Sequence, residues 1–504
     1  MYGDFSRWTH DAAHRYRRVL QQQGRILLDA DWNALNALLL DEIQGLASDV
    51  IGAHGGPAGN CGFRVVPKPG DLAVGDPDKD RLQAFANTLP APGLARKDEF
   101  FLTGGHYWVD GLLCVLPTDT TYRQQPDWPP FADSENREPL DVTAGGFLIS
   151  IQVWERHQTD HDAALIREVA LLGPDTCTRT KIVWQVRAEP MDLDAVFGAA
   201  TPLDRLNAAI ELADIWLAEH SYPSRPMRRP LSPPPKLPRP PLFRAWVSDG
   251  PSIDDPCILP ADARFRGREN QLYRFEIHNG GTDEAAELSK VTFKVSRDNG
   301  SVTFPLITLN GATATVEHLG RDRRSGLSDG DIVEILDDMF ILHGDPGVLA
   351  RVQSIDSDEN TIMLEYSAGV SPPVYDATSA SKPFLRRWDH KGDMKKNNGA
   401  LSVAAAISDQ GFPIEAGILA QFVQVAGDPP MRYRTGDYWL VPARTATGNV
   451  EWPSEMIGGK QAPMALPPAG IRRHYAPIAL IRNGEVLSLR RVFGELAQEP
   501  PAGP

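Results

Sequence analysis

The sequence has few of the features that would mark a metal protein, a membrane protein or a secreted protein. It contains four cysteines, at positions 61, 114, 177 and 257, and no two of them have the CxxC spacing of a zinc site or redox motif. No run of about 18 apolar residues occurs, so we expect no membrane span. The first residues lack a basic region followed by an apolar core. We therefore expect no signal peptide, synthesis in the cytoplasm, and release only by lysis or within a larger assembly.

The short motifs of common enzyme classes are missing too. The sequence has no G-x-S-x-G nucleophile elbow, no P-loop and no dinucleotide-binding fingerprint, so we predict no cofactor and recognise no catalytic constellation. The net charge of −15 argues against nucleic-acid binding as the main role.

Two abundant residue types favour β structure. Glycine and proline number 43 each, and few segments have helical periodicity over a helix length, which is typical of short strands joined by turns. A chain of 504 residues is long enough for about two to four domains. We therefore predict a mainly β, multidomain protein of β-sandwich or small β-barrel modules with a helical N-terminal segment.

The helical segment is expected before residue 60. Asp11 is placed to cap a helix over residues 12–23, and Gly24 to end it. A second helix is expected over residues 32–50. It would carry an apolar stripe at helical spacing, made of Leu35, Leu38, Leu39, Ile43 and Leu46. This stripe predicts either a docking element for a partner or a surface that packs on its own domain.

Strands and turns account for most of the remaining sequence, with one further helix expected over residues 202–219. The clearest predicted strands are residues 147–154, 181–186, 271–277, 291–296, 330–336, 352–355, 361–365 and 478–481, and one strand around 438–439. Asn483-Gly484 predicts a hairpin turn.

Shifts in composition divide the chain into consecutive parts. The predicted parts are a helical docking segment (1–60), a β-rich domain with a terminal helix (61–221), a proline- and arginine-rich linker (222–244), a β domain with a small barrel-like module (245–385), a C-terminal β domain (386–498) and a disordered tail (499–504).

Histidines and carboxylates occur in two clusters that could suggest metal chemistry. His10 and His14 have the i,i+4 spacing of a zinc-protease helix, but Asp11 stands where that motif needs glutamate. His157, Asp160 and His161 follow a predicted strand. A polar loop is the default interpretation there, and a metal site is the alternative.

Paired acidic residues elsewhere have simpler interpretations than catalysis or calcium binding. Asp29 and Asp31 are expected to cap the second helix or pair with Arg25 or Arg18, because glycosidase carboxylates must face each other across a sugar. Residues 298–300 and 356–360 do not have EF-hand spacing and are expected to form turns.

Aromatic residues near the C-terminus could form a sugar-binding surface. Tyr438, Trp439 and Trp452 are the candidates, with Trp388 and the pair Tyr107-Trp108 elsewhere. Because adjacent strand residues point to opposite faces, at least one ring of each Tyr-Trp pair is expected to fill a core.

Segments along nearly the whole chain resemble a little-characterised family encoded in gene clusters for phage-tail-like contractile injection systems and in tailed phages. They are GDFSR (3–7) with QQGRILLDADWN (22–33), EVALLGPDT (168–176), ENQLYR (269–274), FKVSRDNGS (293–301) and GDYWLVPARTATG (436–448).

This resemblance implies a structural or adaptor role in a particle and no known reaction. Its expected partners are other particle proteins of the baseplate, sheath, spike or fibre, with several copies in a symmetric assembly. A carbohydrate-binding adhesin that uses Tyr438, Trp439 and Trp452 on a cell-surface glycan is the alternative, and a surface-polymer hydrolase is the third reading.

Overall fold

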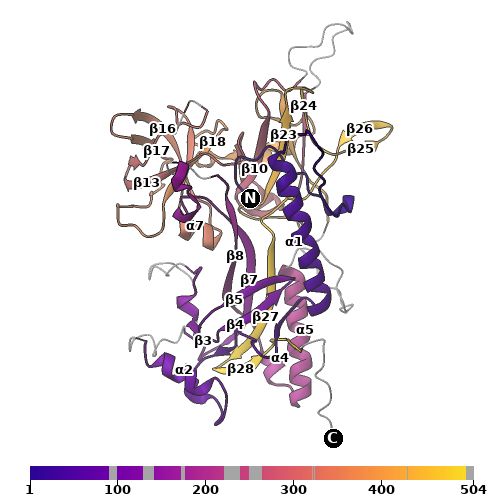
Figure 1. The fold of residues 1–504 in the computed structure, drawn as a ribbon, viewed down its shortest axis with the longest axis vertical. Coiled ribbons are helices and arrows are strands. Elements are labelled where there is room, and N and C mark those ends of the chain that lie inside the picture. Colours follow the sequence, from indigo (N-terminus) through magenta and orange to yellow (C-terminus); the bar gives the residue numbers. More distant parts are fainter. Residues whose placement is uncertain are drawn as a thin grey trace. The chain divides into compact units, whose positions relative to one another are not determined.

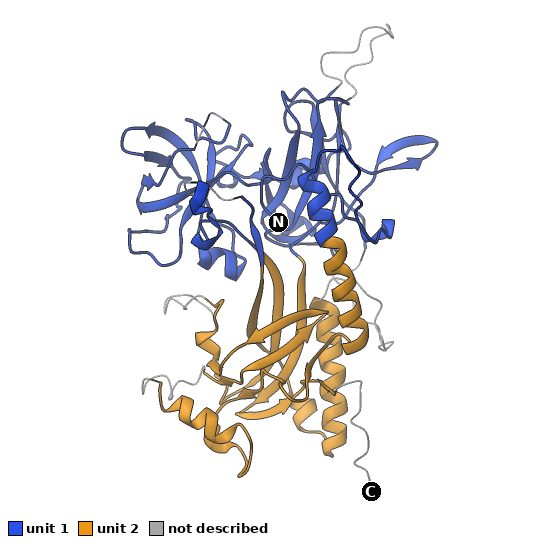
Figure 2. Cartoon of the chain, in the orientation of Figure 1, with its two compact units in different colours: residues 1–36, 157–180, 238–471 blue, residues 37–156, 181–237, 472–504 orange. Residues whose placement is uncertain are grey.

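The computed structural model describes residues 1–89, 99–128, 141–171, 176–220, 239–248, 264–320, 322, 324–427 and 429–494. The chain forms two compact units (Figure 2). Unit 1 comprises residues 1–36, 157–180 and 238–471, and unit 2 comprises residues 37–156, 181–237 and 472–504. Each unit is therefore assembled from three separate stretches, whereas the composition suggested consecutive domains. The reason is that strands far apart in the sequence pair with each other.

The protein is mainly β and multidomain, with a long helix near its N-terminus, as predicted. Unit 1 contains a β-sandwich whose sheets have the strand orders β19-β12-β10-β23-β24 and β20-β21-β9. Phe243 and Phe422 of the smaller sheet contact Trp439 of the larger sheet within one shared apolar core. The strands are β9 (Leu242–Val247), β10 (Gln271–Asn279), β12 (Thr292–Ser296), β19 (Leu401–Ser402), β20 (Phe412–Pro413), β21 (Ile418–Val423), β23 (Tyr438–Arg444) and β24 (Asn449–Val450).

Unit 1 also contains a small closed barrel with its own apolar core, so the barrel-like module predicted after residue 245 is present. Figure 1 shows the barrel strands β13, β16, β17 and β18 together beside β10 of the sandwich. The order around the barrel is β13 (Thr303–Asn310), β14 (Thr313–Val316), β17 (Thr361–Glu365), β16 (Val348–Asp356), β15 (Ile332–Leu336) and β18 (Phe384–Trp388). Unit 1 also contains two ribbons and two short helices. The ribbons are β11 (Gly281–Thr282) with β22 (Arg432–Tyr433) and β25 (Ser454–Ile457) with β26 (Lys460–Pro463), and the helices are α6 (Ala285–Leu288) and α7 (Asp338–His343).

Unit 2 is built around a sheet that is covered on both faces. Its strand order is β28-β27-β7-β8, and it pairs the C-terminal β27 with β7. On β7, Ile149 and Ile151 enter the core shared with β4 and β5, whereas Leu148 packs against α4 and α5. Burial on both faces explains why residues 147–154 read as a nearly continuous apolar run. These elements are β4 (Gly105–Val109), β5 (Leu112–Leu116), β7 (Gly146–Gln158), β8 (Arg179–Pro190), α4 (Asp194–Phe197), α5 (Pro202–His220), β27 (Arg473–Arg482) and β28 (Glu485–Ser488).

Smaller elements surround that core. They are β1 (His54–Pro57) and β29 (Val492–Phe493), which extend the β4–β5 hairpin into a four-stranded sheet; β2 (Val65–Val66), β3 (Phe101–Leu102) and β6 (Thr120–Thr121), which form a three-stranded sheet; and α2 (Lys79–Ala86). The helix α2 lies inside a stretch that we expected to be wholly β. Its Leu82 and Ala86 are buried against Val66 and Phe101, so packing overrides a weak helical pattern.

The predicted helix over residues 12–23 is wrong. Only a 3₁₀ turn, Ala12–His14, forms there, and Asp11 caps it by accepting a hydrogen bond from the Ala13 amide. Tyr16 and Leu20 are exposed, so no apolar surface of the described chain stabilises a helix that would be marginal by itself.

The second predicted helix is present as α1 (Asp29–Ile51), and the helix over 202–219 is present as α5. Because α1 begins at Asp29, Asp31 lies in its first turn and is not its cap. No helix of the described chain is long and apolar enough to cross a membrane. The linker predicted over 222–244 lies mostly outside the described residues, and from Leu242 the chain is already the strand β9. The predicted tail, 499–504, also lies outside them.

Two hairpin turns of unit 2 have left-handed backbone, as their sequences require. Asn483-Gly484 joins β27 to β28 and Asp110-Gly111 joins β4 to β5. The helix α1 packs against the second turn, where Gln44 Nε2 of α1 donates to the Asp110 carbonyl oxygen at 2.9 Å. A Cβ atom on Gly111 would lie 2.3 Å from the Gln44 carbonyl oxygen, so only glycine allows this close approach.

We predict that Gly111→Ala destabilises unit 2 more than Gly484→Ala does. Both glycines have φ near +80°, at +80° and +84°, but nothing lies within 4 Å of a Cβ on Gly484. The left-handed backbone costs alanine about 1–2 kcal/mol at either position. At Gly111 the clash with α1 adds about 1–3 kcal/mol more. Chemical denaturation measures both, and equal losses of unfolding free energy would contradict the close packing of α1 on this turn.

Candidate functional site

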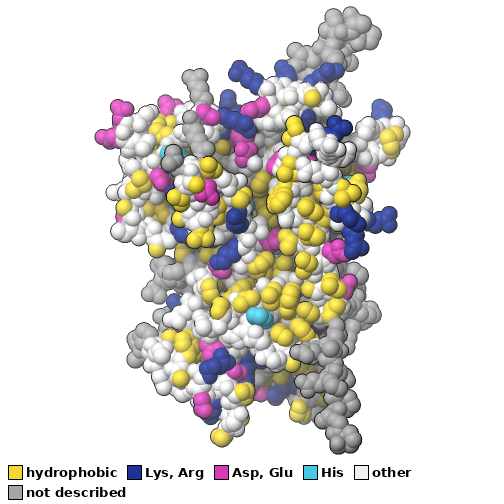
Figure 3. Space-filling view, in the orientation of Figure 1, with side chains coloured by type: hydrophobic (Ala, Val, Ile, Leu, Met, Phe, Trp, Pro, Cys, Tyr) yellow, Lys and Arg dark blue, Asp and Glu magenta, His cyan; other side chains and the backbone are white. Residues whose placement is uncertain are grey.

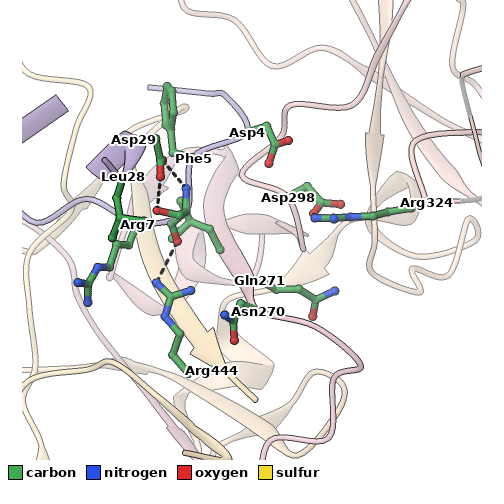
Figure 4. Close-up of a pocket in the computed structure, with 12 residues that line it drawn as sticks. Asp4, Phe5, Arg7, Leu28, Asp29, Asn270, Gln271, Asp298, Arg324 and Arg444 are labelled. Carbon is green, nitrogen blue, oxygen red and sulfur yellow. Dashed lines mark hydrogen bonds and ion pairs between the residues drawn. The ribbon is translucent and has the colours of Figure 1, made fainter. Parts of the chain in front are cut away.

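Four of the segment groups that the sequence singled out meet at one cavity of about 310 Å³ in unit 1 (Figure 4). The group at 168–176 does not line it, and residues 172–175 are outside the described chain. The lining residues are Asp4, Phe5, Ser6, Arg7, Leu28, Asp29, Asn270, Gln271, Leu272, Asp298, Arg324 and Arg444. We call residues 1–7 the N-terminal segment.

The deepest part of the N-terminal segment is held by a turn and a buried arginine. Asn299 Nδ2 donates to the carbonyl oxygens of Met1, at 3.2 Å, and Gly3, at 3.0 Å. Arg274 Nη1 donates to the Met1 carbonyl oxygen at 3.1 Å and to Asn299 Oδ1 at 3.2 Å. Asn299 adopts φ 51° and Gly300 φ 65°, so the Asn-Gly pair forms the predicted turn. The side-chain amide of Asn299 is thereby free to hydrogen-bond to the N-terminal segment.

Tyr2 fills a site between two guanidinium groups. Its ring centroid lies 4.0 Å from Arg274 Cζ and 3.6 Å from Arg386 Cζ, and its hydroxyl donates to Glu276 Oε1 at 2.9 Å. Burial and the neighbouring Glu276 carboxylate raise the pKa of Tyr2, so the hydroxyl stays protonated as a donor. A Cβ on Gly300 would lie 2.8 Å from the ring, which explains the glycine at that position.

A buried charge network lies behind Tyr2, on the face of the larger sheet opposite the sandwich core. Lys294 Nζ lies 3.1 Å from Glu276 Oε1 and 2.8 Å from both carboxylate oxygens of Glu334. Arg274 Nε donates to Glu276 Oε2 at 2.5 Å, and Trp388 Nε1 donates to Glu334 Oε2 at 2.9 Å. Because Glu334 and Trp388 belong to the barrel, the network joins the barrel to the sandwich inside unit 1.

The outer part of the N-terminal segment is tied to the start of α1. Asp29 accepts hydrogen bonds from the Ser6 amide at 2.8 Å and the Ser6 hydroxyl at 2.6 Å. Burial disfavours the charged form of Asp29, but the hydrogen bonds from Ser6 outweigh it, and the pKa of Asp29 lies below its usual value. Arg444 Nη2 donates to the Ser6 carbonyl oxygen at 2.9 Å, so both Asp29 and Arg444 reach the segment in Figure 4.

Two further charged residues of the cavity lining, Arg324 and Asp298, pair with each other, and Arg7 pairs with Glu451 outside the lining at 3.2 Å. Arg324 bridges Glu269, at 3.0 Å, and Asp298, at 2.8 Å; Figure 4 shows it pointing at Asp298. Its pKa is raised, first by the hydrogen bond to Asp298. Asp29, Arg444, Arg324 and Asp298 therefore hold separate parts of the chain together, so we interpret the cavity as an intramolecular anchor.

The metal-site candidates do not converge. His157 Nε2 lies 2.8 Å from Thr178 Oγ1, Asp160 pairs with Arg167 at 3.0 Å, and His161 Nε2 lies 3.0 Å from the Lys382 carbonyl oxygen. Within the described ranges, no three histidine, cysteine, aspartate or glutamate side chains are grouped so that they could hold a metal ion. His10 and His14 do not share a helical face, because the helix expected there does not form.

The aromatic candidates lie against or within the sandwich core. Trp439 is 2% exposed and Tyr438 is 8% exposed, and the Arg274 guanidinium stacks on the Tyr438 ring at 3.7 Å. Trp452 packs against the same core, and its Nε1 donates to the Met464 carbonyl oxygen at 2.8 Å. These rings therefore do not form the exposed platform that the sugar-binding reading needs.

The apolar candidates on α1 divide between half-buried and exposed positions. Leu35 and Leu38 are half-buried, whereas Leu39 and Ile43 are exposed.

Sequence reasoning missed Tyr2, Arg274, Asn299, Arg324 and Arg386 as members of a site. The available signal was the presence of three of them, Tyr2, Arg274 and Asn299, within or beside the singled-out segments, together with the charged residues that alternate with apolar ones along 271–279.

Comparison of the sequence with those of known proteins places the chain in a family. Residues 1–215 and 238–487 match the model of DUF6519, a family of unknown function. The chain belongs to this family. No curated protein and no solved structure matches it. All residues that line the cavity lie within the matched ranges, so the anchor of the N-terminal segment is part of what the family model covers.

We predict that Asn299→Gly loosens the N-terminal segment. Glycine keeps the left-handed backbone but removes the hydrogen bonds to Met1, Gly3 and Arg274, at an expected cost of about 3 kcal/mol. Limited proteolysis and denaturation of the full chain measure the effect. Asn360→Gly, at φ 50° in the turn between β16 and β17, is the matched control and should change stability by less than about 0.5 kcal/mol. Equal effects of the two changes would rule out the anchoring role of Asn299.

A second prediction concerns pH. The ring of His157 lies 6.1 Å from that of Phe5, and burial lowers the pKa of His157 from 6.5 to about 3. Below pH 6.5 the unfolded chain takes up a proton at this residue that the folded chain does not. The contribution of His157 to the free energy of unfolding is therefore complete above pH 6.5. It is lost as the pH falls towards 3, by at most about 1.4 kcal/mol per pH unit.

Denaturation curves between pH 7 and pH 4 measure this loss, and His157→Gln should flatten it. His14→Gln, at an exposed position, is the control. A His157→Gln profile that is parallel to that of the parent chain would refute the assignment.

Proposed function

We propose that this chain is a structural or adaptor component of a phage-tail-like contractile injection particle, in a baseplate, fibre or spike-associated position, and that it acts by assembly. The segments that line the cavity, together with 168–176, resemble those of proteins encoded with such particles, which supports the kind of particle. An internal anchor built from these segments agrees with a role in which they shape the protein rather than react with a substrate.

The exposed apolar surface of α1 is the observation that best supports a role in assembly. We call its exposed members, Leu39, Leu40, Ile43, Leu46 and Val50, the apolar face of α1. Apolar side chains gather in a band over this helix in Figure 3. Contiguous exposed apolar surface of this kind marks sites of interaction with other proteins, because leaving it in water is costly.

The protein composition of native particles tests this proposal. We expect the chain to co-purify with sheathed particles at constant stoichiometry, measured by quantitative mass spectrometry. Chains carrying Ile43→Glu should be lost from particles, because a carboxylate cannot be buried at a docking surface without a partner. Leu165→Glu is the matched control, since Leu165 is 94% exposed and lies outside α1.

Particles that form without the parent chain would contradict the particle assignment. Glycan arrays and metal analysis of the isolated chain would then test the adhesin and hydrolase readings. Equal incorporation of the Ile43→Glu and Leu165→Glu chains would contradict the role given to the apolar face of α1.

A further inference from the structure

The helix α1 differs from an ordinary surface helix in which of its side chains are buried and which are exposed. The fully buried positions are small or polar, since Ala30 and Ser48 are buried and Gln44 and Ser48 hydrogen-bond to Asp110, whereas Leu35 and Leu38 are only half-buried. The large apolar residues point outward, with 50% of Leu39, 60% of Ile43, 67% of Leu46 and 53% of Val50 exposed. A surface helix normally places its apolar stripe toward the core, so this helix is built to be covered by something else.

The spacing of the outward residues is that of a coiled-coil seam. Positions 32, 36, 39, 43, 46 and 50 alternate in steps of four and three, which places 32, 39 and 46 at d and 36, 43 and 50 at a. The d positions hold Trp32, Leu39 and Leu46, and the a positions hold Asn36, Ile43 and Val50. Leucine at d with β-branched residues at a favours two parallel strands, and one asparagine at a fixes the register and the number of strands.

The residues that flank the seam agree with a parallel pair. In such a pair each g position faces the following e position of the other helix. Leu35 would then meet Leu40, and Glu42 would meet Ala47, of the second copy. An antiparallel pair would bring the g positions together, including the acidic Glu42 and Asp49. The same two acidic residues disfavour an anionic lipid surface as the partner.

We propose that the apolar face of α1 is covered by α1 of a second copy of this chain, in a short parallel two-stranded coiled coil. The inference rests on the part of the proposed function that makes this face the assembly surface, and it does not depend on the kind of particle. The helix is already fixed by its inner side, so pairing needs no new folding and a seam of less than about three heptads can suffice.

The first test is sedimentation equilibrium of the purified full chain. We expect a monomer–dimer equilibrium. Ile43→Glu and Leu46→Glu should each weaken it by about 100-fold or more, because each change removes apolar burial from both copies. Leu165→Glu should leave it unchanged, and far-ultraviolet circular dichroism should show that all the variants are folded. A chain that stays monomeric, a trimer, or a dimer insensitive to Ile43→Glu would overturn the proposal.

The second test is disulfide cross-linking under mild oxidation, in a chain with Cys177→Ser and Cys257→Ser. Facing a positions lie close in a parallel pair, so Ile43→Cys should give a cross-linked dimer. Asp41→Cys, two residues away on an exposed side, should not. Cross-linking of Asp41→Cys in preference to Ile43→Cys would overturn the register.

These outcomes separate the two proposals. A dimer in solution from a chain that native particles lack supports this inference and contradicts the particle assignment. A monomeric chain that still enters particles through Ile43 overturns this inference and leaves another particle protein as the partner. Monomer binding to phosphatidylglycerol vesicles that Ile43→Glu abolishes would likewise overturn it, in favour of a lipid surface.

Discussion

The buried charge network of unit 1 is the constraint on which the arrangement of the N-terminal segment, the barrel and the sandwich depends. Lys294 sits between the carboxylates of Glu276 and Glu334, and Arg274 shares Glu276 with Tyr2. Burial alone would raise the pKa of Glu276, but Lys294 and Arg274 outweigh it and lower that pKa, so the carboxylate remains charged. Removing any one member would leave an uncompensated buried charge, which is far more costly than losing an exposed ion pair. The network therefore fixes the barrel, the sandwich and the N-terminal segment against one another within unit 1.

This constraint explains which parts of the fold could be predicted. The alternation of residues 271–277 predicts a strand, and β10 is that strand, with Tyr273, Phe275 and Ile277 in the sandwich core. The same alternation normally sends the charged residues to water. Here Arg274 and Glu276 are buried, because the barrel and Tyr2 cover the second face. Pairing between strands far apart in the sequence is not visible in periodicity, so neither the covered face nor the make-up of the two units could be foreseen.

The candidate site shows the same division. The sequence could single out GDFSR and FKVSRDNGS as unusual wording, but not that Asn299 of one would hold Gly3 of the other. The helix expected over residues 12–23 fails because helical spacing without a packing surface is weak information, whereas α1 forms because its inner side has the Asp110-Gly111 turn to pack on. The alternating spacing of four and three between positions 32 and 50 of α1 can be read from the sequence alone. We could propose a role for it only once the structure showed that Leu39, Ile43 and Leu46 are exposed while Ala30 and Ser48 are buried.

We propose that parts such as the N-terminal segment have their contacts satisfied internally, whereas one surface, the apolar face of α1, needs a partner. Hydroxyl-radical footprinting of the dilute chain and of the assembled chain, read out by mass spectrometry, tests this division most directly. We predict that Leu39, Ile43 and Leu46 react readily in the dilute chain and become protected on assembly, while Tyr2 is protected in both states. Equal reactivity of the α1 residues in the two states, or fast oxidation of Tyr2 in the dilute chain, would contradict it.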